Sequence, residues 1–539
     1  MQQRGVSGWL AIAALLAMVL VNASGRGQAA GEDPLVAAAR DGDLAAVRAL
    51  LAQRANANTA GRDGSTALLW ATHHSNLDMA RALIAAGAKV DTPNRFGVTP
   101  LLQASRSGDA PLIDVLLKAR ASVSLSHPDG ETALIAASRA GRLDAVTLLL
   151  EAGAAVNAAD TLQDQTALMW AAAEGHADIV SALLKAGADP NRGARVTALK
   201  KREHADHPTG GFTALMFAVR NGHEEIARTL IQAGADVKAT NGDGATAAII
   251  AIVNDRFDLA KELLDRGANA NDGSLYFAVD MHDATSDMRA RDGSRLRANH
   301  DNQTTALDLI KVLLDRGADS NQAFVGQLHS ASLCCGDDVN ASPFYRAAIA
   351  SDVEVIKLML AHGAKVEWSP SEVKKEGDSG TGGGANGRGA NANVGKTPLM
   401  VTLVGGRGAP FGGGPGFNRT GPPPFREAAD RAPLNAVTTL LAAGADPNAK
   451  APDGSTPLHQ AVTARQVPII RALVAGGARL DAVNKDNLTP LQLAEKPESG
   501  PGNATQMDQD AYQPPRNTKE EVIAALRELV GLEAAGAKP

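Results

Sequence analysis

A short motif recurs along this chain, and its spacing constrains the fold more than any other feature. The motif is Thr, then Ala or Pro, then an apolar run, as in TALLWA, TPLLQA, TALMWA and TPLQLA. It begins at Thr66, Thr99, Thr132, Thr166, Thr213, Thr246, Thr397, Thr456 and Thr489. Several successive copies lie 33 or 34 residues apart, and divergent copies at Asp33, Ser274 and Ser342 bring the total to twelve. A repeat of this period indicates small units that stack to bury a shared core.

Each copy is typical of a helix–turn–helix unit. Thr before the apolar run suits the N-cap of a first helix, and Pro at the next position suits its first turn. A Gly-His or Gly-Asp turn leads to a second helix that carries Leu-Leu and ends at Gly-Ala, as in SALLKAGAD. Gly187 in that segment is predicted to take the left-handed conformation that ends a helix. Asp-Gly pairs such as Asp63-Gly64 predict the connecting turns.

Many copies of T-[PA]-L-x-x-A followed by L-L-x-x-G-A make the chain resemble the ankyrin-repeat family over nearly all of residues 33–530. The resemblance implies an all-α solenoid of about twelve helix-turn-helix units joined by β-turns, which serves protein–protein recognition. Only the copy at 456–459 has the full Thr-Pro-Leu-His of the family; other copies carry Leu, Met or Ile in place of His459. Because family members pack through that position, we expect the substitution to affect packing rather than function.

Insertions interrupt the repeat and divide it. The sequence predicts an N-terminal stack over 31–321, a Cys-containing insertion over 322–341 and a C-terminal stack over 342–539. Insertions are expected between units at 192–209, 322–341 and 367–394, and between the two helices of a unit at 283–304, 405–430 and 496–517. Residues 518–530 are expected to restore the last second helix, and the Gly/Pro-rich stretch 411–425 to form a mobile loop.

The N-terminus predicts export. Arg4 precedes an apolar run over 9–21, and small residues follow up to Ala30. This run is shorter than the roughly 20 apolar residues that a membrane-spanning helix needs, so residues 1–30 are predicted to be a signal peptide. Cleavage is expected near Ala30, with Ala23 as the rival site and an uncleaved anchor as the alternative. The mature protein is then periplasmic or secreted, without stable membrane insertion.

Composition limits the possible partners. The formal net charge of −6 argues against nucleic acid as a ligand, because phosphate neutralisation needs a strongly basic face. Only 3 % of residues are aromatic, so each large ring is informative. A monomer that binds another protein is the expectation.

The candidate binding residues lie on the predicted first helices. The resemblance implies that the residue four after the capping Thr, and the one three further on, face a concave groove. These positions hold aromatic residues or Arg in several copies, and such residues dominate binding hot spots. The predicted partner-binding set is Trp70, Arg106, Arg139, Trp170, Phe217 and Arg220. The alternative is that the aromatic members only fill space between adjacent helices.

Other motifs offer weaker chemistry. Gly395-Lys396-Thr397 resembles the end of a phosphate-binding loop, but the glycine spacing is wrong and no strand is predicted before it, so it is interpreted as the start of a repeat.

Two sets of residues in the insertions support a second hypothesis. Glu203, His204, Asp206 and His207 could bind a metal, and the adjacent Cys334 and Cys335 could act in redox chemistry. The leading hypothesis is a non-catalytic interaction scaffold without a cofactor. An enzyme, redox or metal protein built from the insertions is the alternative.

Overall fold

The computed structural model describes residues 33–196, 210–282, 302–323, 341–370, 395–404, 423–497 and 517–534. These residues form two compact units. Unit 1 contains residues 33–162 together with 185–187, and unit 2 contains residues 163–184 and the described residues from 188 onward. The predicted division of the chain at 322–341 remains a prediction.

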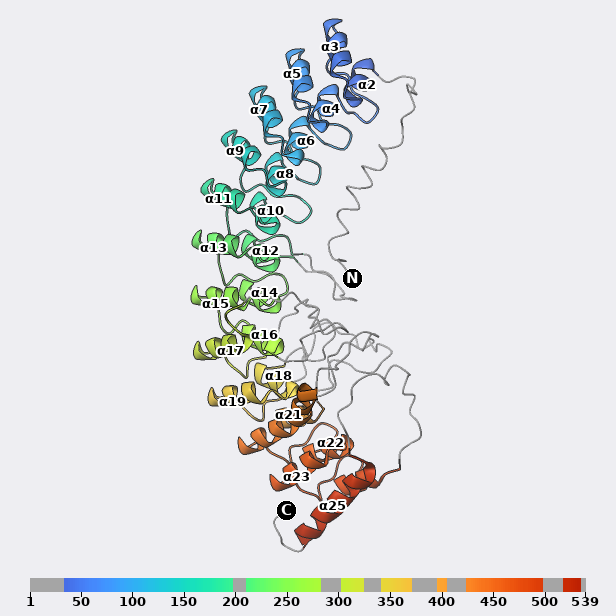
Figure 1. Cartoon of the computed structure of the whole chain (residues 1–539), viewed down its shortest axis with the longest axis vertical. Coiled ribbons are helices and arrows are strands. Elements are labelled where there is room, and N and C mark those ends of the chain that lie inside the picture. The colour runs from blue at the N-terminus through green and yellow to red at the C-terminus, as the bar shows by residue number, and fades with distance from the viewer. Residues whose placement is uncertain are drawn as a thin grey trace. The chain divides into compact units, whose positions relative to one another are not determined.

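Unit 1 consists of four helix pairs in two layers (Figure 1). We call the first helix of each pair the inner helix and the second the outer helix. The inner helices are α2 (Pro34–Arg40), α4 (Ala67–His73), α6 (Pro100–Ser107) and α8 (Ala133–Arg139). The outer helices are α3 (Leu44–Ala52), α5 (Leu77–Ala85), α7 (Ala110–Lys118) and α9 (Leu143–Glu151). Each inner helix packs against the next inner helix, and each outer helix against the next outer one.

Unit 2 continues the same pattern. Its inner helices are α10 (Ala167–Glu174), α12 (Ala214–Asn221), α14 (Ala247–Val253), α16 (Ser274–His282), α18 (Pro343–Ala350), α20 (Pro398–Val404), α22 (Pro457–Thr463) and α24 (Pro490–Glu495). The outer helices are α11 (Ala177–Lys185, of which all but Lys185 belongs to unit 2), α13 (Glu224–Gln232), α15 (Phe257–Asp265), α17 (Ala306–Asp315), α19 (Val353–Ala361), α21 (Pro423–Ala442), α23 (Val467–Ala475) and α25 (Lys519–Ala534).

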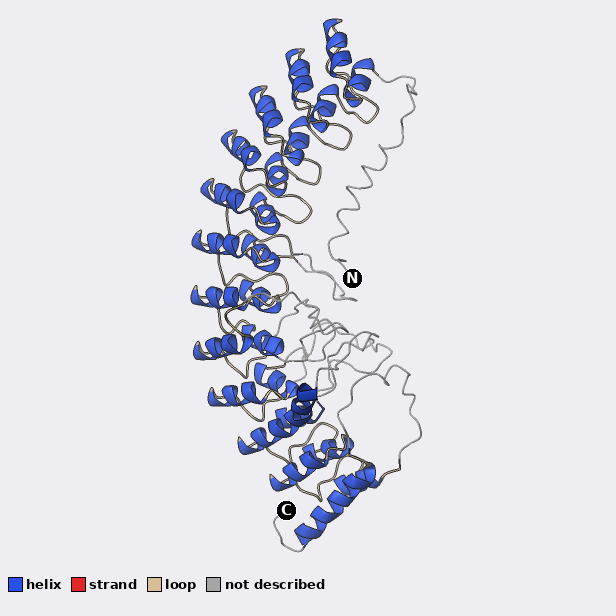
Figure 2. Ribbon diagram, viewed as in Figure 1, coloured by secondary structure: helices blue, strands red, loops and turns tan. Residues whose placement is uncertain are grey.

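The all-α class is confirmed, and the residues that the structure describes form the twelve predicted helix pairs. Figure 2 shows helices and loops, and the described parts of the chain contain no strand beyond isolated bridges. Most of the predicted caps are confirmed as well; the hydroxyls of Ser274 and Thr397 are exceptions, because they have no hydrogen-bond partner. The Thr66 hydroxyl accepts a hydrogen bond from the Leu69 N–H at 3.3 Å, and the Thr132 hydroxyl accepts one from the Ile135 N–H at 3.2 Å. These bonds satisfy backbone donors that a helix start leaves without a partner.

The turns that join successive helix pairs form short projecting loops, called fingers below, and the backbones of neighbouring fingers are hydrogen-bonded to each other. Ala60 and Thr66 form an isolated antiparallel bridge across one finger. Gly64 has φ +82°, and a Cβ there would lie 2.9 Å from the Arg95 nitrogen. That nitrogen donates to the Asp63 carbonyl at 2.8 Å and so links one finger to the next. The Asp-Gly pair is therefore required by both conformation and close approach.

Most outer helices end at a glycine, and at several of these ends an asparagine side chain from the preceding helix pair binds the glycine carbonyl. Gly187 has φ +90°, as predicted. The Asn448 amide donates to the Gly477 carbonyl at 2.9 Å and accepts from the Arg479 N–H at 2.8 Å. The same two-bond clamp, from an asparagine to a glycine carbonyl and to the second N–H after it, is made by Asn58, Asn191, Asn271 and Asn321. These clamps fix the register between successive units.

Three predicted insertions do separate the helices of one pair. Helix α16 packs against α17, α20 against α21, and α24 against α25, although residues outside the described part of the chain lie between them. One boundary needs correction: α21 begins at Pro423, so residues 423–430, assigned to the insertion, are helical. The stretch 411–422 lies outside the described residues. The closing helix predicted over 518–530 is α25.

The position of His459 is a packing position, as expected. His459 is 1 % exposed, and Leu69, Leu102 and Ile135 are buried at the equivalent place. The His459 Nδ1 accepts from the Thr456 N–H at 3.3 Å and lies 2.9 Å from the Thr456 hydroxyl, while Nε2 lies 3.0 Å from the Leu488 carbonyl. Burial lowers the pKa of His459, more than the Leu488 carbonyl raises it. The ring is therefore a neutral bridge to the next unit.

Candidate functional site

The predicted binding residues all lie on inner helices, three in each unit. Unit 1 carries Trp70 on α4, Arg106 on α6 and Arg139 on α8. Unit 2 carries Trp170 on α10, and Phe217 and Arg220 on α12.

Trp70 is the centre of an aromatic cluster in unit 1. Its ring is half-buried and meets His73 edge to face, with centroids 5.6 Å apart. It stacks on His74 with centroids 6.2 Å apart. The His74 Nε2 lies 2.7 Å from the Arg40 carbonyl, which fixes His74 against the end of α2. Trp70 therefore has packed neighbours at the end of its own helix and at the C-cap that follows, and it retains an accessible part of its surface.

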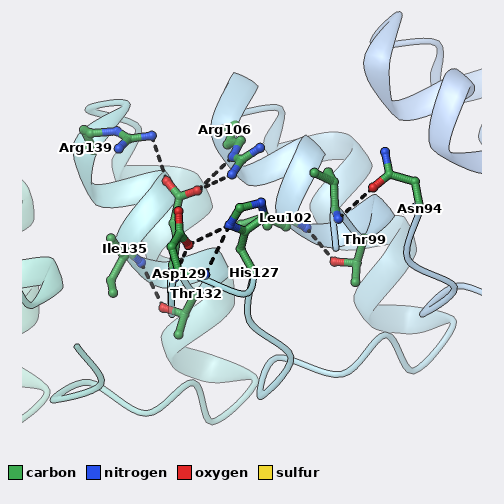
Figure 3. A network of polar contacts seen from close by, with 11 residues as sticks. Asn94, Thr99, Leu102, Arg106, His127, Asp129, Thr132, Ile135 and Arg139 are labelled. Carbon is green, nitrogen blue, oxygen red and sulfur yellow. Dashed lines mark hydrogen bonds and ion pairs between the residues drawn. The ribbon is translucent and has the colours of Figure 1, made fainter. Parts of the chain in front are cut away.

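Arg106 and Arg139 meet at one carboxylate, that of Glu131 (Figure 3). The Arg106 Nε and Nη2 donate to Glu131 Oε2 at 2.8 and 2.5 Å, and the Arg139 Nη2 donates to Oε1 at 2.7 Å. The Glu131 side chain is 8 % exposed, against 30 % for Arg106 and 42 % for Arg139. Two guanidinium groups from neighbouring helices are thus held by a single, nearly buried negative charge.

The finger before α8 positions Glu131. The Glu131 N–H donates to the Asp129 carboxylate at 3.0 Å, and its carbonyl accepts from the His127 N–H at 2.9 Å. His127 Nδ1 also lies 2.7 Å from Asp129. Burial acts to raise the pKa of Asp129, but the Glu131 and His127 hydrogen bonds and the charges of His127 and Arg106 lower it below its usual value. The finger therefore carries an ionised, internally bonded acid that holds Glu131 in place.

In unit 2, Phe217 and Arg220 are brought together by a third residue. Phe217 is 7 % exposed, and its ring lies 5.3 Å from that of Phe212 in the preceding finger. The Arg220 guanidinium carbon lies 5.1 Å from the centroid of each ring. Phe217 is therefore a packing residue that supports Arg220 by cation–π contact. Trp170 is half-buried on α10, the inner helix that packs against α12.

Sequence reasoning missed Glu131, Phe212 and His74, which organise the three clusters. Glu131 and Phe212 both occupy the position just before a capping Thr, where other copies carry Ser65 or Val98. An acidic or aromatic residue at that position could have indicated from the sequence that it supports a neighbouring inner-helix side chain. Phe96, in the finger between α5 and α6 of unit 1, is a large apolar side chain that is 63 % exposed.

The residues of the alternative hypothesis lie outside the described part of the chain. These are Glu203, His204, Asp206 and His207, and the cysteines Cys334 and Cys335. Among described residues, no group of three or more His, Cys, Asp or Glu side chains could hold a metal ion. No described helix is both long and apolar enough to cross a membrane. Lys396 and Thr397 precede α20, an inner helix that packs on α18 and α22, so this segment begins a repeat.

Comparison with known families agrees with this architecture. A family model described as ankyrin repeats (3 copies) matches residues 10–94, 101–194, 195–274 and 425–499, which is more than half of the chain. No curated protein matches the sequence. The helix pairs, the capping threonines, the finger turns and this match together show that the chain belongs to the ankyrin-repeat family.

Proposed function

We propose that this protein is an exported, non-catalytic scaffold that binds a partner protein through the inner-helix face of its repeats. One observation carries the proposal. At two recurring positions, four and seven residues after the capping Thr, the inner helices present Trp or Arg side chains that are only partly buried, namely Trp70, Arg106, Arg139, Trp170 and Arg220. Trp and Arg are the side chains that most often anchor protein interfaces. Ankyrin repeats generally mediate protein–protein interaction, which agrees with this assignment.

The contacts that hold these arginine side chains in place favour binding as well. Glu131 holds Arg106 and Arg139, and two phenylalanine rings hold Arg220. A side chain held in one geometry loses less conformational freedom when a partner docks, so affinity is gained without new contacts. Residues 1–30 are predicted to be a signal peptide, so we expect the mature protein to act outside the cytoplasm as a monomer.

The binding test uses the full-length protein and two tryptophan variants. Trp70→Ala and Trp170→Ala should each weaken capture of a cross-linked partner from the exported fraction by about 2 kcal/mol or more, as central aromatic anchors do. Val530→Ala, on the outer helix α25, is the matched control because Val530 is an exposed apolar residue (38 %) away from the inner face. Melting is measured on the same samples. Tryptophan variants that lose stability while their folded fraction binds normally would overturn the proposal.

Export is tested separately. Protein recovered from outside the cytoplasm should begin near Gly31 on N-terminal sequencing. Exported material that retains Met1 would show an uncleaved anchor instead.

A further inference from the structure

Arg220 is an inner-helix arginine whose charge has no acidic partner. It lies in the last turn of α12, and its Nε donates to the Asn221 side-chain oxygen at 3.3 Å. Its guanidinium carbon lies 5.1 Å from the ring centroids of both Phe212 and Phe217. Among the residues that the structure describes, none forms an ion pair with Arg220. The guanidinium is therefore held in place by neutral groups.

The equivalent arginine of α6 in unit 1 shows what Arg220 lacks. Arg106 also lies seven residues after its capping Thr, and it donates to the Glu131 carboxylate in the finger that follows α6 (Figure 3). Glu131 stands directly before the next capping Thr. In the finger that follows α12, the residue at that position is Ala245, which is buried and has no side-chain acceptor. In unit 2 the chain therefore does not supply the carboxylate that pairs with Arg106 in unit 1.

The inner helices that pack on both sides of α12 carry no acidic residue at the position of Arg220. Seven residues after the capping Thr, α10 has Ala173 and α14 has Val253. Burial lowers the pKa of Arg220, whereas the pKa of Arg228 on α13 is raised, first by its hydrogen bond to Glu262. Arginine remains charged at neutral pH in either case. Arg220 is therefore a cation in largely apolar surroundings.

The hydrogen-bond donors that Arg220 still offers are on its two terminal nitrogens. Because Nε is directed at Asn221, Nη1 and Nη2 keep their N–H groups without an acceptor among the described residues. These two nitrogens form one edge of a planar fork that matches the two oxygens of a carboxylate. Part of the Arg220 side chain is exposed to solvent. A carboxylate carries one negative charge and so balances one guanidinium.

The surroundings of Arg220 favour tight pairing with an anion. Phe212 and Phe217 are 8 % and 7 % exposed, and charges interact more strongly beside apolar groups than in water. Asn221 is itself fixed, because its amide donates to the Ala173 carbonyl at 2.7 Å. The cation–π contacts and the hydrogen bond to Asn221 hold the guanidinium in one orientation. Little conformational freedom is then lost when an anion binds.

We propose that Arg220 binds one carboxylate of the partner protein, the side chain of an Asp or Glu residue, through Nη1 and Nη2. This carboxylate takes the role for Arg220 that Glu131 has for Arg106. The inference rests on the proposed function and adds the chemistry of one contact. A phosphate group fits less well, because it carries a charge of about −1.5 to −2 and three acceptor oxygens, which one guanidinium does not satisfy.

The test is photo-cross-linking to the full-length protein, because covalent capture detects weak ligands. The probe is a dipeptide of benzoylphenylalanine and glutamate, acetylated and amidated so that the side chain is its only charge. Two control probes carry glutamine or phosphoserine in place of glutamate, and a third has glutamine and a free C-terminal carboxylate. Mass spectrometry locates the labelled residues. The glutamate probe should label the surroundings of Arg220 at least about tenfold more than the glutamine probe, and less as salt is added.

Three variants change the net charge equally. Arg220→Gln removes the binding group, and Ala245→Glu places in the chain the carboxylate that Glu131 provides in unit 1. Both should lose about tenfold of the labelling by the glutamate probe. Arg228→Gln, on the outer helix of the same pair, is the control and should lose less than about twofold. Arg220→Lys keeps the charge without the planar fork, so its labelling should be intermediate, and it serves if Ala245→Glu melts early.

Several results would overturn the inference. Equal labelling by the glutamate and glutamine probes, or equal labelling of Arg220→Gln and Arg228→Gln, would show that Arg220 does not bind a carboxylate. Stronger labelling by the phosphoserine probe or by the free C-terminus would show that another anion is preferred. Capture of an exported partner that depends on Trp70 or Trp170 but not on Arg220 would refute this inference and leave the proposed function standing. Labelling that depends on Arg220, without any partner captured through the inner helices, would contradict the proposed function instead.

Discussion

Removing Arg106 should destabilise unit 1 through the charge that it leaves behind. The Glu131 side chain is 8 % exposed, and Arg106 supplies two of the three N–H bonds that its carboxylate accepts from arginines. Breaking a fully buried ion pair costs about 3–5 kcal/mol. Arg106 is 30 % exposed, so water can replace part of the loss, and Arg139 remains. We expect Arg106→Gln to cost about 1–2 kcal/mol.

The double variant separates this effect from a loss of packing. Arg106→Gln together with Glu131→Gln leaves no buried charge without a partner, so it should be no less stable than Arg106→Gln alone. The coupling energy of the cycle is then about 1 kcal/mol. Because repeat proteins are stabilised mainly by neighbouring units, the change is local to α6 and α8.

Native-state hydrogen exchange on the full chain measures this local stability. Amides in α6 and α8 should exchange faster in Arg106→Gln and recover in the double variant. Arg81→Gln is the control, because the Arg81–Asp78 pair is 3.9 Å long and both side chains are more than half exposed. Strictly additive costs for the two substitutions, or an Arg106→Gln variant that exchanges like Arg81→Gln, would refute the reasoning.

Three further predictions concern positions that recur along the repeat. The folded state lowers the pKa of His459, so this residue's contribution to stability is complete above pH 6.5 and is lost as the pH falls through the folded pKa. His459→Leu should therefore make the free energy of unfolding depend less on pH in this range, and an unchanged slope would contradict this. Gly187→Val should cost about 1–2 kcal/mol in urea unfolding, because φ is +90° although a Cβ would meet no atom within 4 Å; no change in the midpoint would refute the strain. Asn448→Ala removes its bonds to Gly477 and Arg479 and should cost about 1–3 kcal/mol by the same assay, whereas a neutral result would show the clamp to be dispensable.

The sequence predicted what depends on local chemistry. Capping by Thr66, the stop at Gly187 and the finger turn at Gly64 each follow from a residue and its immediate neighbours, and each is present. The clusters could not be predicted in the same way. Glu131 meets an arginine that is 25 positions away in the sequence, so its role depends on how one finger lies against the preceding helix. Phe217 is buried because Phe212 covers it, and motif position alone could not reveal that.

The asparagine clamps keep the same geometry between successive helix pairs whatever the length of chain between the two clamped residues. The same two bonds join residues 29 positions apart at Asn448 and Gly477 and 46 positions apart at Asn271 and Gly317. Loop-closure entropy rises only logarithmically, by about 0.6 kcal/mol for each doubling of length. Additional residues between 282 and 302 would therefore leave the register of the following helix pairs unchanged. For protein engineering, that junction is a place to splice a foreign domain into the scaffold while the repeats on both sides keep their register.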